Sequence, residues 1–130
     1  MSHTPINLFR DWLEAYVSTA GYTISRGMWE EAATGSAGKK FVAVWSDAGR
    51  SPNGDIQFPH IRVIVTGRAN GRALGDVELV ELFAESLIDA AIANFSTSCM
   101  MQIRPVGSIM GPYYTETSRP WYEINFELTC

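Results

Sequence analysis

The chain has 130 residues, a length that fits one domain with one modest hydrophobic core. Hydrophobic residues make up 46% of it and charged residues 18%, which excludes a disordered chain, and no apolar run is long enough for a membrane-spanning helix. The formal net charge of −4 argues against tight, sequence-independent nucleic-acid binding, because such binding needs several cations on phosphates.

An N-terminal helix is the first predicted element. Its apolar residues recur at spacings of three and four, which gives one stripe consisting of Phe9, Trp12, Leu13, Tyr16, Val17 and Ala20. Thr4 can cap this helix, Pro5 fits its first turn, and Gly21 can end it. Residues 22–39 hold one candidate short strand, and we expect the rest of that segment to be irregular.

Two strands joined by a loop follow. Residues 40–47 form an apolar run rich in branched and aromatic side chains, which predicts a strand. The sequence PNG at 52–54 marks residues 48–57 as a turn, within a long loop at 46–58. Residues 59–67 predict the next strand, one face of which carries Ile61, Val63 and Val65.

The segment TGRANGRALGD, residues 66–76, combines three glycines with two arginines, as phosphate-binding loops do. The lysine and hydroxyl of a P-loop are missing, and the glycines do not have the spacing of a dinucleotide-binding fingerprint. We interpret the segment as a strand-to-helix connection in which Arg68 and Arg72 face solvent and are available to a protein partner. On this interpretation, Arg68→Glu leaves folding intact and impairs assembly.

A second amphipathic helix follows this connection. Asp76 is a natural N-cap, and Glu78 and Glu81 favour the positive end of the helix dipole. The apolar stripe predicted to face the core consists of Val80, Phe83, Ala84, Leu87, Ile88, Ala91, Ile92 and Phe95.

The end of the chain predicts an antiparallel hairpin. Apolar and polar residues alternate in the last strand, with Tyr122, Ile124, Phe126 and Leu128 on one face. Pairing this strand with residues 99–107 around a turn at 111–118 puts Ile103 opposite Phe126, so that both faces match in chemistry. The same register brings Cys99 next to Cys130.

Together these elements predict a single α+β domain over residues 1–130. We expect a two-layer sandwich with a mostly antiparallel or mixed sheet of about four strands and two helices packed on one face. This arrangement buries one apolar stripe of each helix against one apolar face of the sheet.

Aromatic residues near the last strand are candidates for partner contacts. Trp121 falls on its polar side, and Tyr113 and Tyr114 lie at the predicted hairpin tip. Apolar side chains at such positions favour contact with a neighbouring protein. In contrast, neither His3 nor His60 has a metal-ligating neighbour at suitable spacing, and two cysteines cannot complete a four-ligand zinc site, so we expect no metal, cofactor or catalytic site.

The order of these elements resembles that of a known family. FPHIRVIVTG, a glycine-rich loop, a long amphipathic helix and GPYYTETSRPWYEINFEL together resemble the tail-terminator or tail-completion proteins, minor tail proteins of long-tailed bacteriophages. The resemblance covers roughly half the chain, from Phe58 to Leu128, while residues 22–57 carry no match. Its motif is a Gly-Pro turn followed by Arg119, Tyr122, Ile124 and Phe126.

The resemblance implies a structural protein of the virion tail, not an enzyme, that forms a ring on the end of the tail tube, stops tube polymerisation and receives the head. Its implied partners are copies of itself in a ring, a hexamer by family resemblance, the tail tube protein and a head-completion or neck protein. DNA is implied only as passing cargo, and no membrane partner is expected. The absence of a signal-peptide layout at the N-terminus adds the expectation of assembly in the host cytoplasm.

A closed ring needs two different contact surfaces on each subunit, and the loops and the hairpin supply candidates of both charges. The candidate interface residues are Asp47, Arg50, Asp55, Arg68, Arg72, Tyr113, Tyr114 and Trp121. Two alternatives stay open. One is another neck connector or minor capsid protein, and the other is a small α+β ligand-binding domain or enzyme whose Arg68–Arg72 loop holds an anion.

Overall fold

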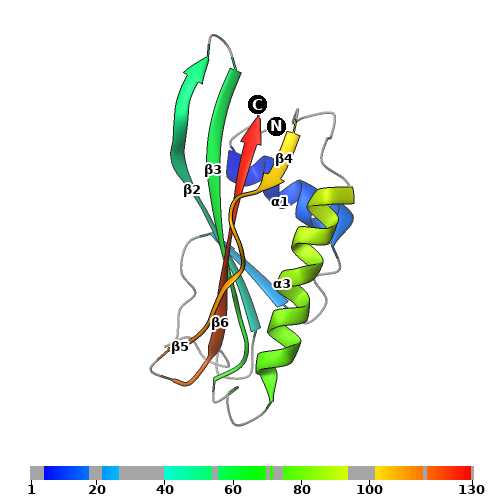
Figure 1. The fold of residues 1–130 in the computed structure, drawn as a ribbon. Coiled ribbons are helices and arrows are strands. Elements are labelled where there is room, and N and C mark those ends of the chain that lie inside the picture. The colour runs from blue at the N-terminus through cyan, green and yellow to red at the C-terminus, as the bar shows by residue number, and fades with distance from the viewer. Residues whose placement is uncertain are drawn as a thin grey trace.

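Two helices and one mixed sheet make up the described part of the molecule (Figure 1). The computed structural model describes residues 5–17, 22–26, 40–53, 56–69, 71, 75–93, 102–115 and 117–129. Its elements, in chain order, are α1 (Pro5–Tyr16), β1 (Tyr22–Arg26), β2 (Lys40–Asn53), β3 (Ile56–Thr66), α3 (Asp76–Ala93), β4 (Gln102–Pro105), β5 (Met110–Tyr114) and β6 (Pro120–Thr129).

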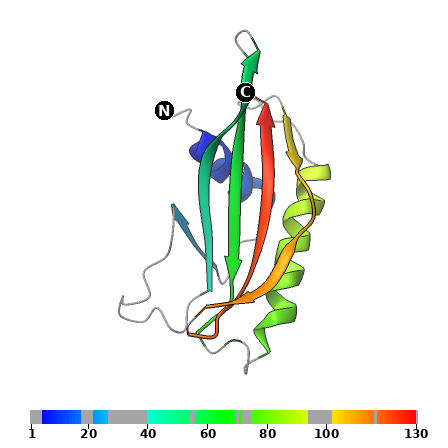
Figure 2. The ribbon, with the colours of Figure 1, turned by 60° about the vertical axis from the view of Figure 1, so that its left-hand side comes forward.

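The sheet has the strand order β1-β2-β3-β6-β4, and β5 also pairs with β6 (Figure 2). The β1–β2 pair is parallel, and the other strand pairs are antiparallel. The predicted α+β class with a mixed sheet is confirmed. The sheet has six strands instead of about four, because residues 22–26 and 110–114 also pair.

Both helices cover the same face of the sheet. The alternation in β3 and β6 turns their branched and aromatic side chains toward α1 and α3, as expected for strands with one buried face. The buried core joins these side chains to those of the helices: Phe9, Trp12, Leu13, Val17, Val42, Val44, Ile61, Val63, Val65, Val80, Phe83, Ala84, Leu87, Ala91, Ile103, Tyr122, Ile124, Phe126 and Leu128.

The predicted stripe of α3 is largely confirmed, with one error at its C-terminal end. Five of its members are buried and Ile88 is half-buried, whereas Ile92 is 66% exposed. Ile92 follows Ala91 by one residue, which turns it about 100° around the helix and away from the sheet. Thr4, Ala20, Gly21 and Phe95, also named in the helix predictions, lie outside the described residues.

The loop predicted at 46–58 is wrong, because most of it is strand. β2 continues to Asn53 and β3 begins at Ile56, and the two form a long hairpin with register shifts on either side of Arg50. These irregularities let a sequence with turn-type residues remain paired. We call residues 47–53 and 56–60 the β2–β3 arm. Its outer end extends beyond the other strands (Figures 1 and 2).

The predicted C-terminal pairing is right, but its register is wrong by two residues. Ile103 lies opposite Leu128, and Arg104 lies opposite Glu127. The connection turns tightly between Thr115 and Arg119, after β5 has paired with the start of β6, so the turn is not at 111–118. A shift of two residues keeps every side chain on its expected face. Cys99 and Cys130 lie outside the described residues.

Candidate interaction surfaces

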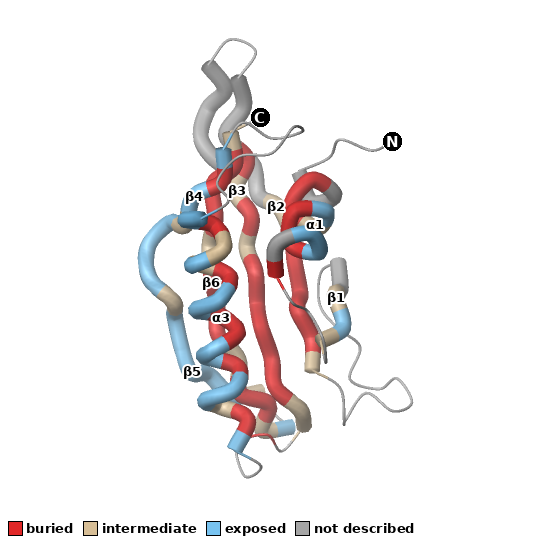
Figure 3. The backbone as a smooth tube through the Cα atoms, turned by 90° about the vertical axis from the view of Figure 1, so that its right-hand side faces the viewer, coloured by how far each residue is buried: buried red, intermediate tan, exposed pale blue. Residues whose placement is uncertain are grey.

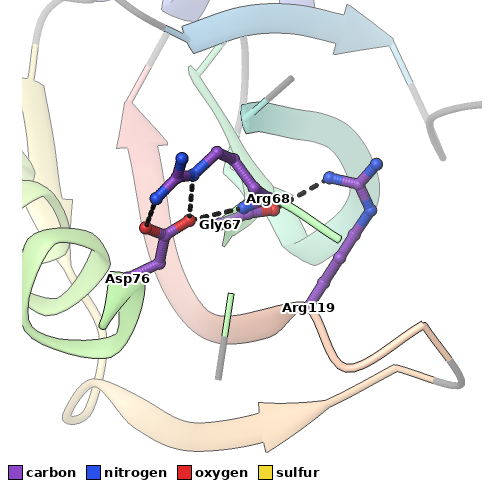
Figure 4. A network of polar contacts seen from close by, with 4 residues as sticks. All are labelled: Gly67, Arg68, Asp76 and Arg119. Atoms are coloured by element: carbon purple, nitrogen blue, oxygen red, sulfur yellow. Dashed lines mark hydrogen bonds and ion pairs between the residues drawn. The ribbon is translucent and has the colours of Figure 1, made fainter. Parts of the chain in front are cut away.

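One ion pair holds the glycine- and arginine-containing segment against the start of α3 (Figure 4). Arg68 Nε donates to Asp76 Oδ2 at 3.0 Å, and Arg68 Nη2 donates to Asp76 Oδ1 at 2.8 Å. The backbone N of Arg68 also donates to Oδ2 at 2.8 Å. The Asp76 side chain is 1% exposed and that of Arg68 is 40% exposed. The two side-chain hydrogen bonds form a bidentate pair, which fixes the segment against the start of α3.

Two glycines of this segment allow the backbone to approach α3 and β6 closely. A Cβ atom at Gly67 would stand 2.9 Å from Asp76 Cβ, and one at Gly71 would stand 2.8 Å from Pro120 Cδ. Real side chains essentially never make such short contacts, so these positions exclude larger residues. Close packing thus accounts for both glycines without a bound phosphate.

The ion pair changes what a charge reversal at Arg68 should do. The sequence interpretation treated Arg68 as facing solvent, and Arg68→Glu as harmless to folding. Because Arg68 contacts Asp76 in the structure, a glutamate at position 68 would place a second carboxylate beside this buried one and destabilise the fold. An assembly defect in Arg68→Glu would therefore not separate a partner contact from damage to the fold.

Asp76 also predicts a pH dependence of stability. The hydrogen bonds from the Arg68 side chain hold the pKa of Asp76 below its ordinary value, against the opposing effect of burial. A lowered pKa in the folded state contributes stability that is full above the unfolded pKa of about 4 and is lost as the pH falls through the folded pKa. We expect the gap in unfolding free energy between the wild type and Asp76→Asn to narrow in urea titrations below about pH 4. A gap that stays constant across that range would contradict this role.

Arg119 is a buried cation that joins β6 to the end of β3. Its side chain is 0% exposed, and Nη1 donates to the carbonyl oxygen of Gly67 at 2.9 Å (Figure 4). Its guanidinium lies 5.2 Å from the ring centroid of Phe41, a cation–π distance. Gly67 N donates in turn to the Pro120 carbonyl at 2.9 Å. Arg119, noted in the sequence only as part of a motif, therefore supports the same segment as Asp76.

The candidate aromatic residues lie on neighbouring strands. Tyr113 is opposite Trp121, and their ring centroids are 4.6 Å apart. Tyr113 is 46% exposed, Tyr114 is 40% exposed, and Trp121 is half-buried. The two tyrosines are on β5 and not at a hairpin tip, and they leave apolar surface accessible near the edge of the sheet.

The remaining candidates fall on the β2–β3 arm or outside the described residues. The backbone of Asp47 pairs with that of His60, and that of Arg50 with Phe58. Asp55 and Arg72 lie outside the described residues. The six described candidates do not form one patch: two are on the arm, Arg68 contacts the start of α3 from the preceding connection, and three are on β5 and β6.

The sheet face opposite the helices carries ion pairs between neighbouring strands. Arg62 Nη2 lies 2.7 Å from Glu123 Oε1, and Arg104 Nη2 lies 3.0 Å from Glu127 Oε1. Arg62 also lies over the ring of Trp45, at 5.2 Å from its centroid. This face is thus polar at its surface and internally charge-balanced where it is described.

Sequence reasoning missed the outer face of α3. Leu79 and Leu82 are 52% and 62% exposed beside several carboxylates. The sequence pattern that could have identified this face is that both leucines lie outside the apolar stripe of the helix. Exposed apolar residues grouped in this way are typical of an interaction surface.

Within the described ranges, no group of three or more His, Cys, Asp or Glu side chains is arranged to hold a metal ion. No helix in those ranges has the length and hydropathy needed to cross a membrane.

A family model described as "Phage tail termination protein" matches residues 2–130, nearly the whole chain. The chain belongs to this family. A comparison with curated proteins gave no match. The resemblance noted from residues 58–128 is thereby confirmed, and the family match also includes residues 22–57, in which the sequence alone showed no match. A phage tail termination protein acts in the virion tail, so the surfaces described above belong to a component of tail assembly.

Proposed function

We propose that this protein closes into a ring on the end of the tail tube, stops tube polymerisation and provides the surface that joins the tail to the head. The observation that carries the proposal is the family match over residues 2–130. The proposed partners are further copies of the chain, the tail tube protein and a head-completion or neck protein. DNA passes through the ring as cargo. The role is structural and needs no catalysis or cofactor.

Features of the described residues support a role in contact rather than in chemistry. Close packing and the Arg68–Asp76 pair account for the glycine-rich segment. Exposed apolar side chains on α3 and near β5 provide surface that a neighbouring protein can bury. The alternative in which the Arg68–Arg72 loop holds an anion is weakened, because Nε and Nη2 of Arg68 already donate to the carboxylate of Asp76.

Deletion of the gene from its phage tests the proposal. Without a terminator the tube has no stop, so electron microscopy should show tails of variable and excessive length that do not join heads. A plasmid copy of the gene should restore uniform tails, and a frame-shifted copy should not. Uniform tails of normal length that join heads would contradict the proposal. Uniform tails that fail to join heads would instead favour the alternative of a head-side neck connector.

A further inference from the structure

Tyr122 of β6 is a buried phenol whose hydroxyl makes no hydrogen bond in the described part of the chain. The residue is 3% exposed and belongs to the hydrophobic core. Within the described ranges no fully buried side-chain polar atom lacks a partner, so the Tyr122 oxygen reaches the surface. The phenol therefore presents one unpaired polar atom at the rim of an apolar core, where buried phenols usually have a partner.

One side of the Tyr122 ring is covered by β5. A Cβ at Gly111 would stand 2.9 Å from Tyr122 Cδ1, so the β5 backbone lies directly on the ring. Tyr114 lies opposite Pro120, two residues before Tyr122, which puts Tyr114 and Tyr122 on the same face of the sheet. All of β5 is exposed, and Tyr114 itself is 40% exposed (Figure 3). An accessible aromatic ring therefore lies near the phenol.

Two carboxylates of α3 also lie near this phenol. Glu81 and Glu85 are about one helical turn apart, and both are exposed. Burial raises the pKa of Tyr122, and the charges of Glu81, Tyr114 and Glu85 raise it further. The raised pKa keeps the phenol neutral at neutral pH, so its oxygen can accept a hydrogen bond. We call Glu81, Glu85, Tyr114 and Tyr122 the Tyr122 cluster.

The two carboxylates of the cluster have no countercharge in their own subunit where it is described. Neither Glu81 nor Glu85 forms an ion pair there, and α3 contains no lysine or arginine. Glu78 and Asp89 continue the same acidic row, and like charges three or four residues apart destabilise a helix. A cation bound at the cluster therefore relieves a repulsion that the isolated subunit retains.

The bases whose side chains are described are engaged elsewhere in the same subunit. Lys40 lies 5.0 Å from the ring centroid of Tyr22, and its charge helps to lower the pKa of Asp76. The arginines of this group are each held by a carboxylate or a carbonyl oxygen: Arg10, Arg62, Arg68, Arg104 and Arg119. The chain has one further lysine, Lys39, which lies outside the described residues. The described part of a second copy thus offers no unengaged base to the cluster.

We propose that the Tyr122 cluster binds the side chain of a lysine on another protein of the tail. An ammonium group has three N–H donors, and the two carboxylates and the phenol oxygen supply acceptors for them. The exposed ring of Tyr114 provides a face over which a cation is stabilised. The partner is a tail protein because the chain belongs to a tail termination family. The inference rests on this tail location and not on closure of a ring, so either idea can fail without the other.

Carbodiimide cross-linking of purified wild-type tails tests the occupant, because this reagent joins a carboxylate to a lysine amine in direct contact. Mass spectrometry should find links from Glu81 or Glu85 to a lysine of another tail protein. Glu78 and Asp89, on the same helix, are the internal controls and should give much less product. Equal yields at all four carboxylates would overturn the proposal, since they indicate a diffuse acidic surface. Links from Glu81 and Glu85 to a lysine of a second copy, or no links at all, would overturn it too.

A titration of the isolated protein with N-acetyl-lysine amide tests the site itself. The probe should shift the ring NMR signals of Tyr114 and Tyr122 in a saturable way. Tyr113 pairs with Trp121 on the opposite face of the sheet, so its signals should stay unchanged. N-acetyl-norleucine amide lacks the ammonium and should shift none of these signals. Shifts that do not saturate, or equal shifts with both probes, would contradict the proposal.

Matched double variants separate the cluster from the general charge of α3. Glu81→Gln with Glu85→Gln should weaken the binding of N-acetyl-lysine amide several-fold, because the acceptors of the ammonium are lost. Glu78→Gln with Asp89→Asn removes the same charge from the same helix and should weaken binding much less. Circular dichroism checks that both variants keep their helices. An equal loss in the two variants would overturn the proposal.

Discussion

Leu87→Ala is expected to lower the free energy of unfolding by about 2–5 kcal/mol. Leu87 is 0% exposed and belongs to the core between α3 and the sheet. Truncation removes buried methyl groups and leaves a cavity that the neighbouring strands fill only in part, because β3 and β6 are held by their own ladder. Urea unfolding followed by circular dichroism measures the loss.

Leu82→Ala is the matched control for this prediction. It makes the same chemical change in the same helix, at a side chain that is 62% exposed. It should change the free energy of unfolding by no more than about 0.5 kcal/mol, as surface substitutions usually do. A cost below about 1 kcal/mol for Leu87→Ala would mean that the packing of α3 differs from the arrangement described. Equal costs for the two variants would lead to the same conclusion.

The local periodicity of the sequence predicted the elements that have one buried face. Both helices and β6 have such a face, and their spacings of three to four and of two residues follow directly from backbone geometry. Ile92 was misplaced because it follows the buried Ala91 by one residue, which turns its side chain about 100° away from the buried face. The start of α3 at Asp76 was predicted from its capping chemistry.

Features that depend on pairing between distant segments were harder to predict. Turn-type residues such as Pro52 and Asn53 indicated a loop, yet bulged pairing extends the strands to the end of the β2–β3 arm. The register of Ile103 was wrong because a shift by two residues preserves both faces, so side-chain chemistry alone cannot distinguish the two pairings. The observed register follows from the turn at Thr115–Arg119 together with the irregular pairing of β5, whose register shifts between Met110 and Tyr113.

The sequence indicated which kinds of residue contribute to the candidate surfaces, but not which partners these residues have in the fold. Arg68 was correctly noticed, but its partner is eight residues away, and only the fold shows that Asp76 turns its carboxylate to that arginine. Tyr113 and Trp121 lie on different strands, and their ring contact could be recognised only once the pairing of β5 with β6 was known.

Arg119→Ala is expected to cost roughly 2–5 kcal/mol, through the cavity of a large buried side chain and a buried carbonyl that loses its donor. The carbonyl is that of Gly67, at the point where β3 leads into the segment bound by Asp76. Arg119→Met should recover part of this loss, because it refills the space without replacing the donor. Chemical denaturation of the three proteins measures both differences.

Arg104→Ala is the control for the Arg119→Ala prediction. Arg104 is also paired across strands, with Glu127, but its side chain is 56% exposed. Water and salt screen the guanidinium end of this pair, although the Glu127 side chain is only 10% exposed, so Arg104→Ala should cost less than Arg119→Ala. A similar cost for Arg119→Ala would show that the Gly67 carbonyl finds water or another donor, and that burial of the guanidinium does not stabilise the junction. A large cost at Arg119 alone would instead show that this motif residue holds β6 against the end of β3, and so positions the start of α3.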